Sequence, residues 1–143
     1  MKKILWAPVL MAILATGCQN KTSTNVTPGG NNNSTSGIVT SGKWQVSYFY
    51  DNDKDETTDY SGYTFEFNSD KTLVATRNST STSGTWNETT DDGLPRLVIA
   101  LNTADEKLKE LNDDWVVESK TDNQIKLKDD NPDRNEQLHF NKQ

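Results

Sequence analysis

Hydrophobic and polar residues alternate through the chain from residue 42 onward, in eight short stretches separated by polar turns. The first stretch places four large side chains on one face: Trp44, Val46, Tyr48 and Tyr50. The other seven stretches are centred on residues 63–67, 73–75, 83–86, 97–101, 115–117, 125–127 and 138–140. A period of two is typical of strands with one buried face. The pattern therefore predicts an all-β domain, an eight-stranded antiparallel meander that closes into a barrel or forms a sandwich.

One segment between the fifth and sixth stretches has the features of a short helix. Residues 103–106 match a capping box, in which the hydroxyl of Thr103 and the carboxylate of Glu106 satisfy free backbone amides. Leu108 and Leu111 then fall on one face of the helix. Two turns with two leucines are too small to form a layer of their own. We therefore expect this helix to cover one open end of the sheet.

The first twenty residues follow a different pattern. Two lysines precede an apolar run over residues 4–15, and small residues then lead to a lone cysteine, Cys18. Such a run is typical of a secretory signal peptide, and it is too short to cross a bilayer as a permanent helix. Residues 15–18, Ala-Thr-Gly-Cys, resemble the bacterial lipobox. The resemblance implies a signal peptide over residues 1–17, diacylation of the Cys18 thiol, and acylation of the new amine.

The lipobox resemblance also implies a location. Several acyl chains on one residue are enough for stable attachment to a membrane. Gln19 stands where an aspartate retains many such lipoproteins in the inner membrane, so the resemblance implies the outer membrane. No acidic export tag follows Cys18, which favours a protein that faces the periplasm.

Composition divides the remaining chain into two parts. Residues 18–41 are rich in Asn, Thr, Ser and Gly, and they cannot bury enough apolar surface to offset the entropy of ordering them. We expect a disordered tether there and one folded domain over residues 42–143. That domain contains 21 acidic and 12 basic residues, so its net charge is −9. Such a charge repels phosphate backbones and argues against nucleic acid as a partner.

The start of the first strand carries a family resemblance. Gly42-Lys43-Trp44, followed by seven meander strands, resembles the lipocalins, and more closely the short lipocalin-like domains of bacterial envelope lipoproteins. The resemblance implies a barrel in which Gly42 lets the chain enter tightly. It also implies that Trp44 closes the floor beneath a basic residue of the last strand. Lys142 takes that place by position, as a cation–π contact, and Arg134 is the alternative.

The sequence leaves the use of the barrel interior open. An eight-stranded barrel is just wide enough to be filled by side chains or to hold one small ligand. If it holds a ligand, five aromatic side chains are the candidates to line the cavity: Tyr48, Tyr63, Phe65, Trp86 and Trp115. If it does not, the same side chains fill the core.

Motifs for catalysis or metal binding are sparse. Residues 51–55 place oxygens as a calcium loop does, but Glu56 and Gly62 stand where that loop needs its glycine and its bidentate glutamate. We therefore expect a solvated loop there. His139 is the one histidine of the chain, and no cysteine follows Cys18. We expect no enzyme activity, no cofactor and no metal.

Together these features predict a lipid-anchored, non-catalytic, lipocalin-like protein of the cell envelope. Its expected role is to bind a small apolar or amphipathic molecule. The alternative is a protein-interaction or inhibitor module, in which a filled barrel presents acidic loops to another envelope protein.

Overall fold

The structure is a computed structural model, and it describes residues 35–143. The predicted signal peptide at residues 1–17 and the predicted acylation site Cys18 lie outside the described residues, as does most of the predicted tether. Within 35–143, no helix is long and apolar enough to cross a membrane.

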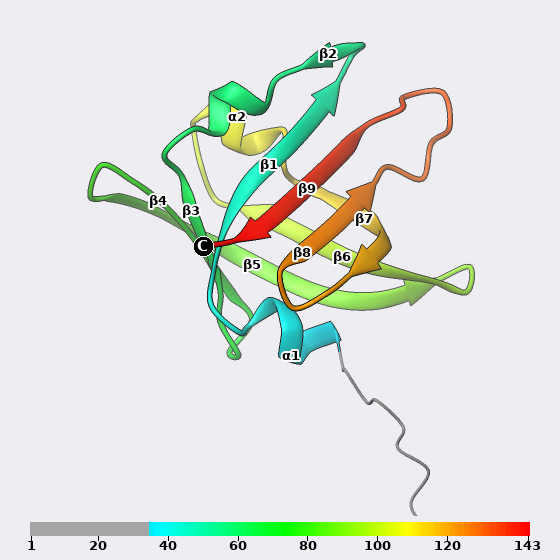
Figure 1. Cartoon of the computed structure of the whole chain (residues 1–143), viewed down its shortest axis with the longest axis horizontal. Coiled ribbons are helices and arrows are strands. Elements are labelled where there is room, and N and C mark those ends of the chain that lie inside the picture. Colours follow the sequence, from blue (N-terminus) through cyan, green and yellow to red (C-terminus); the bar gives the residue numbers. More distant parts are fainter. Residues whose placement is uncertain (1–34) are drawn as a thin grey trace, which may run out of the picture. The chain divides into compact units, whose positions relative to one another are not determined.

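The strands form one antiparallel sheet that closes on itself (Figure 1). Eight strands make up the barrel: β1 (Lys43–Asp51), β3 (Thr64–Phe67), β4 (Thr72–Arg77), β5 (Thr80–Asp91), β6 (Leu94–Leu101), β7 (Asp113–Lys120), β8 (Gln124–Lys128) and β9 (Gln137–Lys142). The remaining strand, β2 (Lys54–Asp55), only forms a hairpin arm with the end of β1. The predicted eight-stranded antiparallel barrel is confirmed.

Strand β1 closes the barrel because it pairs with both ends of the meander. Its register with β9 runs from Trp44 opposite Lys142 to Tyr50 opposite Gln137. Its ladder with β3 is shorter and includes Trp44 opposite Phe65. Trp44 is therefore held between the second strand of the barrel and the last.

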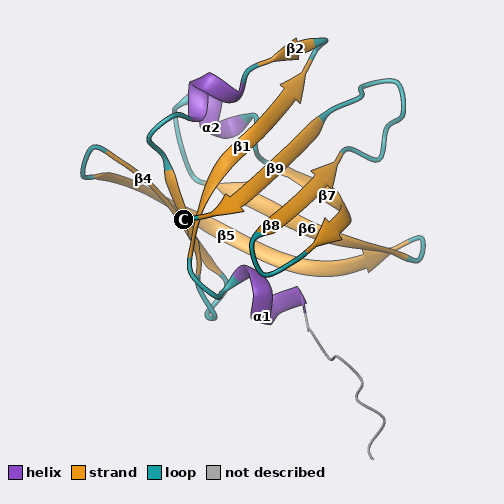
Figure 2. Ribbon diagram, viewed as in Figure 1, coloured by secondary structure: helices purple, strands orange, loops and turns teal. Residues whose placement is uncertain are grey.

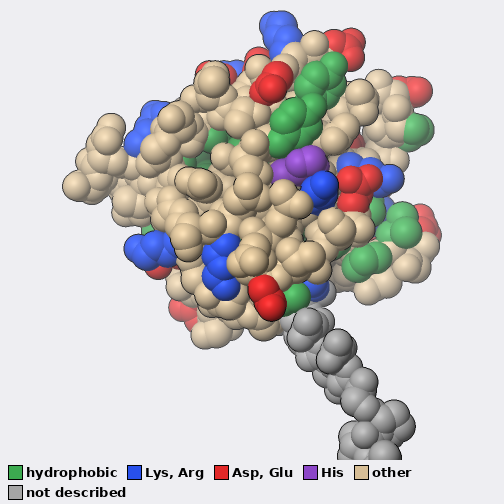
Figure 3. Space-filling view, in the orientation of Figure 1, with side chains coloured by type: hydrophobic (Ala, Val, Ile, Leu, Met, Phe, Trp, Pro, Cys, Tyr) green, Lys and Arg blue, Asp and Glu red, His purple; other side chains and the backbone are tan. Residues whose placement is uncertain are grey.

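A β-bulge between Val46 and Tyr48 interrupts the alternation of β1. A bulge adds one residue to a strand, so the side chains after it change faces. Phe49 is therefore in the core, with 1% of its surface exposed. The prediction that Tyr48 and Tyr50 lie on the inner face is wrong, because Tyr48 lies outside with its ring centroid 5.0 Å from that of His139. Figure 3 shows this histidine at the surface beside hydrophobic side chains.

Helix α2 (Glu106–Lys109) lies between β6 and β7, where the sequence predicts a helix between the fifth and sixth barrel strands. Its N-cap is Asp105, whose carboxylate accepts a hydrogen bond from Lys107 N at 3.0 Å. The prediction of Thr103 as the cap is wrong by two residues. The Thr103 hydroxyl instead accepts a hydrogen bond from Asp105 N at 3.0 Å, which orients the true cap.

The 3-10 helix η1 (Thr57–Tyr60) lies beside α2 over one end of the barrel (Figure 2). The ring of Tyr60 packs edge-on against Phe49, with the centroids 5.0 Å apart. Its hydroxyl donates a hydrogen bond to Lys107 O at 2.9 Å. The Lys107 ammonium in turn lies 2.7 Å from the Glu56 carboxylate. Side chains thus close this end of the barrel.

Helix α1 (Thr35–Val39) lies at the other end, near the start of β1 (Figure 2). Ile38 and Val39 are buried, and Val39 O accepts a hydrogen bond from Trp44 Nε1 at 2.8 Å. The predicted boundary of the domain at residue 42 is therefore corrected, and so is the predicted disorder over the last part of 18–41. These residues belong to the fold because the side chains of Ile38 and Val39 are buried beside Trp44.

Side chains fill the barrel interior. Three tryptophans are at most 1% exposed. Their indole N–H groups donate hydrogen bonds to backbone carbonyls: Trp44 to Val39, Trp86 to Asn68 and Trp115 to Leu111, at 2.8, 2.9 and 3.0 Å. The ring of Phe140 makes edge-on contacts with Phe65 and Phe67, with centroids 5.4 and 5.8 Å apart. Edge-on packing of this kind stabilises aromatic cores beyond the area that they bury.

We expect Trp44→Ala and Trp115→Ala each to lower the free energy of unfolding by about 3–5 kcal/mol, the usual cost of truncating a buried aromatic side chain. Tyr48→Ala, on the outer face, is the matched control and should cost less than about 1 kcal/mol. Urea denaturation followed by tryptophan fluorescence measures all three. An equal loss in Tyr48→Ala, or a small loss in Trp44→Ala, would contradict this packing.

Candidate binding site

The residues predicted to form the barrel floor lie together at the start of β1. Lys142 Nζ is 5.7 Å from the centroid of the Trp44 ring and donates a hydrogen bond to Ser41 Oγ at 2.8 Å. That distance is within the range of a cation–π contact. Gly42 has a φ of +150°, and a Cβ there would lie 3.0 Å from Lys142 Cε, so glycine suits this position. Arg134, the alternative to Lys142, lies instead in the loop between β8 and β9.

Four of the five residues predicted to line a cavity are in the barrel interior, and Tyr48 is not. Phe65, Trp86 and Trp115 are at most 1% exposed, and Tyr63 is 7% exposed. All four belong to one cluster of core side chains. They occupy the interior themselves instead of forming the wall of an open cavity.

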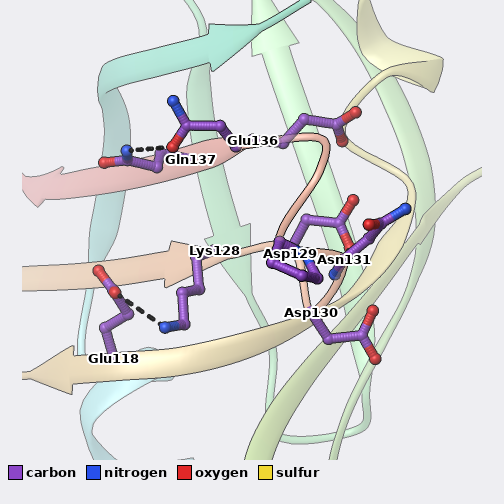
Figure 4. Close-up of a pocket in the computed structure, with 9 residues that line it drawn as sticks. Glu118, Lys128, Asp129, Asp130, Asn131, Glu136 and Gln137 are labelled. Atoms are coloured by element: carbon purple, nitrogen blue, oxygen red, sulfur yellow. Dashed lines mark hydrogen bonds and ion pairs between the residues drawn. The ribbon is translucent and has the colours of Figure 1, made fainter.

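A hollow of about 320 Å³ opens at one rim of the barrel, beside the loop between β8 and β9 (Figure 4). Most of its lining side chains are polar or charged: Glu118, Lys128, Asp129, Asp130, Asn131, Pro132, Asn135, Glu136 and Gln137. A hollow with this lining suits a polar or charged group.

Four carboxylates meet at this rim because four neighbouring strands begin or end there. Asp51 ends β1, Asp113 begins β7, Asp129 follows β8, and Glu136 precedes β9. Carboxylate oxygens of Asp113, Asp129 and Glu136 all lie within 4.8 Å of one another. Glu136 lies next to Asp51 across the pairing of β1 with β9, because Tyr50 pairs with Gln137. We call these four residues the carboxylate cluster.

The carboxylate cluster is largely buried. The side chains of Asp129 and Glu136 are 7% and 13% exposed. Arg134 lies beside both, 3.4 Å from Asp129 Oδ2 and 3.5 Å from Glu136 Oε1. Burial, and then the neighbouring carboxyl group of Asp51, raises the pKa of Glu136 to about 7. Burial also raises the pKa of Asp113.

A second charged group lies on the outer side of the same loop. The Arg96 side chain of β6 is 4% exposed, and its guanidinium is 2.8 Å from Asp130, 3.2 Å from Asp114 and 3.5 Å from Asp91. The hydrogen bond from Arg96 lowers the pKa of Asp130. Figure 4 shows Asp130 pointing away from Glu136. The loop is thus held on two sides.

We define the acidic end as the carboxylate cluster together with Asp91, Asp114 and Asp130. Seven carboxylates face two guanidinium groups there, those of Arg96 and Arg134, which leaves a formal excess of five negative charges before protonation. Oxygen-rich clusters attract hard cations. In the carboxylate cluster, the Arg134 guanidinium beside Asp129 and Glu136 already supplies one positive charge. The arrangement favours the binding of a positively charged group.

Sequence reasoning missed this convergence. It assigned no role to the aspartate pairs at 113–114 and 129–130, and it treated residues 51–55 as a solvated loop. Of that segment, Asp51 reaches the carboxylate cluster. The sequence does show that these acidic residues stand at the ends of predicted strands. Three of those strands, β7, β8 and β9, are consecutive, and β1 joins them when the barrel closes.

The free energy of unfolding should fall as the pH rises from about 5 to 8, because Glu136 binds its proton more tightly in the folded state. A glutamate in the unfolded chain has a pKa of about 4.3. The stabilisation is therefore complete below that pH and is lost as the pH rises through about 7, the raised pKa of Glu136. We expect a loss of roughly 2–3 kcal/mol, measured by urea denaturation at each pH.

Glu136→Gln is the control for this pH dependence, and its profile should be flatter than that of the wild type. The difference between the two profiles separates Glu136 from other titrating groups, such as His139, whose pKa is lowered by burial. Identical profiles in the two proteins would contradict the assignment to Glu136.

Comparison with known proteins gives a fold neighbour and no family. No protein-family model matches the sequence, and no curated protein matches it. A crystal structure of a DUF4847 family protein from Bacteroides vulgatus ATCC 8482 has a similar fold, with a TM-score of 0.55 and 16% sequence identity. The match covers 76% of this chain and 97% of that one. At this identity the likeness shows the shared fold alone.

Proposed function

We propose that this protein is a lipid-anchored, non-catalytic interaction module of the bacterial cell envelope, which binds a positively charged surface of another envelope protein through its acidic end. The observation that carries this proposal is the filled interior. Trp44, Trp86 and Trp115 occupy the space that an apolar ligand would need. Because an eight-stranded barrel has room for core side chains or for one small ligand, a filled barrel favours binding on the outer surface.

The charge of the acidic end supports a cationic partner. Its formal excess of negative charge lies within a domain whose own net charge is −9. Such a field attracts and orients a basic partner, and its effect weakens as salt is added. The side chains of Asp91, Asp114 and Asp130 are 65%, 56% and 50% exposed. They are therefore available for direct contact.

The proposal includes acylation of Cys18 and a position on the outer membrane, facing the periplasm. Acylation would confine the module to one surface, where it meets partners anchored in the same compartment. Confinement of this kind raises the effective concentration of the partner without any new contact.

Cys18→Ser should leave unprocessed precursor and abolish the incorporation of labelled fatty acid, because the thiol is the group that accepts the diacylglycerol. Metabolic labelling followed by electrophoresis measures both effects. Ser23→Ala, five residues further along, is the control and should keep full labelling. Undiminished labelling of Cys18→Ser would refute the lipoprotein assignment.

Carbodiimide cross-linking in intact envelopes tests the acidic end, because it joins carboxylates to lysines with which they are in contact. We expect an adduct that disappears at high salt. Its yield should fall roughly fivefold or more in the double variant Asp91→Asn/Asp114→Asn, since both charges belong to the proposed contact surface. This variant should fold, because Arg96 keeps its closest partner, Asp130, at 2.8 Å.

The matched control is Glu66→Gln/Glu106→Gln, which removes two charges from exposed ion pairs with Lys43 and Lys109. Its adduct yield should equal that of the wild type. Equal yields in the two double variants would contradict the proposed surface. Stoichiometric uptake of an apolar fluorescent probe by the wild type would instead support the small-molecule function.

A further inference from the structure

The loop between β8 and β9, residues 129–136, lies along the acidic end, and we call it the clasp loop. A hydrogen bond from Asp129 N to Glu136 O at 3.0 Å closes its base. A second bond, from Arg134 N to Asn131 O at 3.1 Å, forms its turn. The Arg96 guanidinium binds Asp130 on its outer side, and Glu136 on its inner side lies next to Asp51 of β1.

This inner contact brings two carboxyl groups together, those of Glu136 and Asp51, because Tyr50 of β1 pairs with Gln137 of β9. Two ionised carboxylates have only acceptors and cannot form a hydrogen bond with each other. Among the described residues, nothing donates a hydrogen bond to Asp51 Oδ1, although this atom is buried. Buried polar atoms are rarely left without a partner. One proton on the pair would supply the missing donor.

The charges around Glu136 favour that proton. Three carboxylates and one guanidinium face it from the elements packed against it: Asp51 of β1, Asp113 of β7, and Asp129 and Arg134 of the clasp loop. Lys128 of β8 lines the same hollow, but its ammonium lies 3.5 Å from the carboxylate of Glu118. With every carboxylate of the cluster ionised, four negative charges would face one positive charge. Mutual repulsion of this kind is relieved by binding a proton.

We propose that the clasp loop is a proton-controlled latch, in which a proton shared by Glu136 and Asp51 holds the loop against β1 and its loss releases the loop. On release, one hydrogen bond between the two carboxyl groups breaks and the proton passes to water. Both carboxylates are then ionised and repel each other, and Asp113 and Asp129 add to the repulsion. The inner side of the loop loses its attachment.

The latch changes state near neutral pH, because burial and Asp51 raise the pKa of Glu136 to about 7. Above that pH the open loop presents more negative charge to a cationic partner. Below it the loop is closed and the cluster is partly neutral. The effect on partner binding rests on the proposed function, whereas the opening of the loop requires no partner.

Amide hydrogen exchange of the full-length protein at pH 6 and pH 8, with EDTA and without a partner, tests the latch. After correction for the intrinsic effect of pH on exchange, the protection of the Asp129 and Arg134 amides should fall about tenfold at pH 8, one unit above the midpoint. Amides in the ladder between β5 and β6 should keep their protection. In Glu136→Gln the side-chain amide donates to Asp51 at both pH values, so the clasp loop should stay protected.

Glu118→Gln changes a carboxylate of the same hollow outside the latch and should keep the wild-type response. Should Glu136→Gln fail to fold, Asp51→Asn provides the donor from the other side of the pair and should also abolish the response. Equal protection at the two pH values in the wild type, or an unchanged response in Glu136→Gln, overturns the latch. Neither result affects the cross-linking test, which changes different residues at a single pH.

Discussion

The pairing of β1 with both β9 and β3 is the interaction on which the rest of the structure depends. An open sheet of eight strands would leave two edges unpaired, and unpaired edges invite association with other chains. Closure removes both edges and encloses one hydrophobic face. Trp44 lies in this seam, opposite Phe65 on one side and Lys142 on the other, while its indole binds Val39 O. The same contact therefore joins the seam, the core and helix α1.

Closure also completes the acidic end, because it brings Asp51 of β1 beside the residues of β7, β8 and β9. Strands β7, β8, β9 and β1 are successive neighbours around the barrel, so the residues at their ends share one rim. Carboxylates from distant parts of the sequence are brought together there and are partly buried. Burial and mutual repulsion raise the pKa of Glu136 and favour positive charge at this rim. Since side chains occupy the interior, we place the proposed partner contact at this rim.

The features that sequence reasoning predicts well are local ones. Alternation and turn spacing predict the eight strands, and the helix between β6 and β7 follows from a short polar-to-apolar pattern. Alternation places Tyr48 in the core, whereas the structure places Phe49 there. This difference could not be predicted, because the bulge arises from pairing with β9. Ile38 and Val39 were assigned to the tether for a similar reason. Two apolar residues in a polar segment do not predict burial, because their contact with Trp44 is formed only in the folded structure.

The candidate site depends on the same long-range information. The acidic residues are visible in the sequence, but their convergence depends on the register of β7, β8 and β9, and the approach of Asp51 depends on the closing pair of β1 with β9. The lipocalin resemblance led to the expectation of Lys142 over Trp44, and the two side chains lie 5.7 Å apart in the structure. The lipocalin resemblance does not predict the raised pKa of Glu136, which results from burial and from the neighbouring Asp51.

The central claim is that the barrel is filled by its own side chains and acts through its acidic end. Native mass spectrometry of the full-length lipoprotein, released gently from its own envelope, tests this claim most directly. We predict the mass of the acylated polypeptide with no small molecule attached, together with a protein complex that dissociates at high salt. A small molecule retained by the isolated protein in a fixed ratio would contradict the claim.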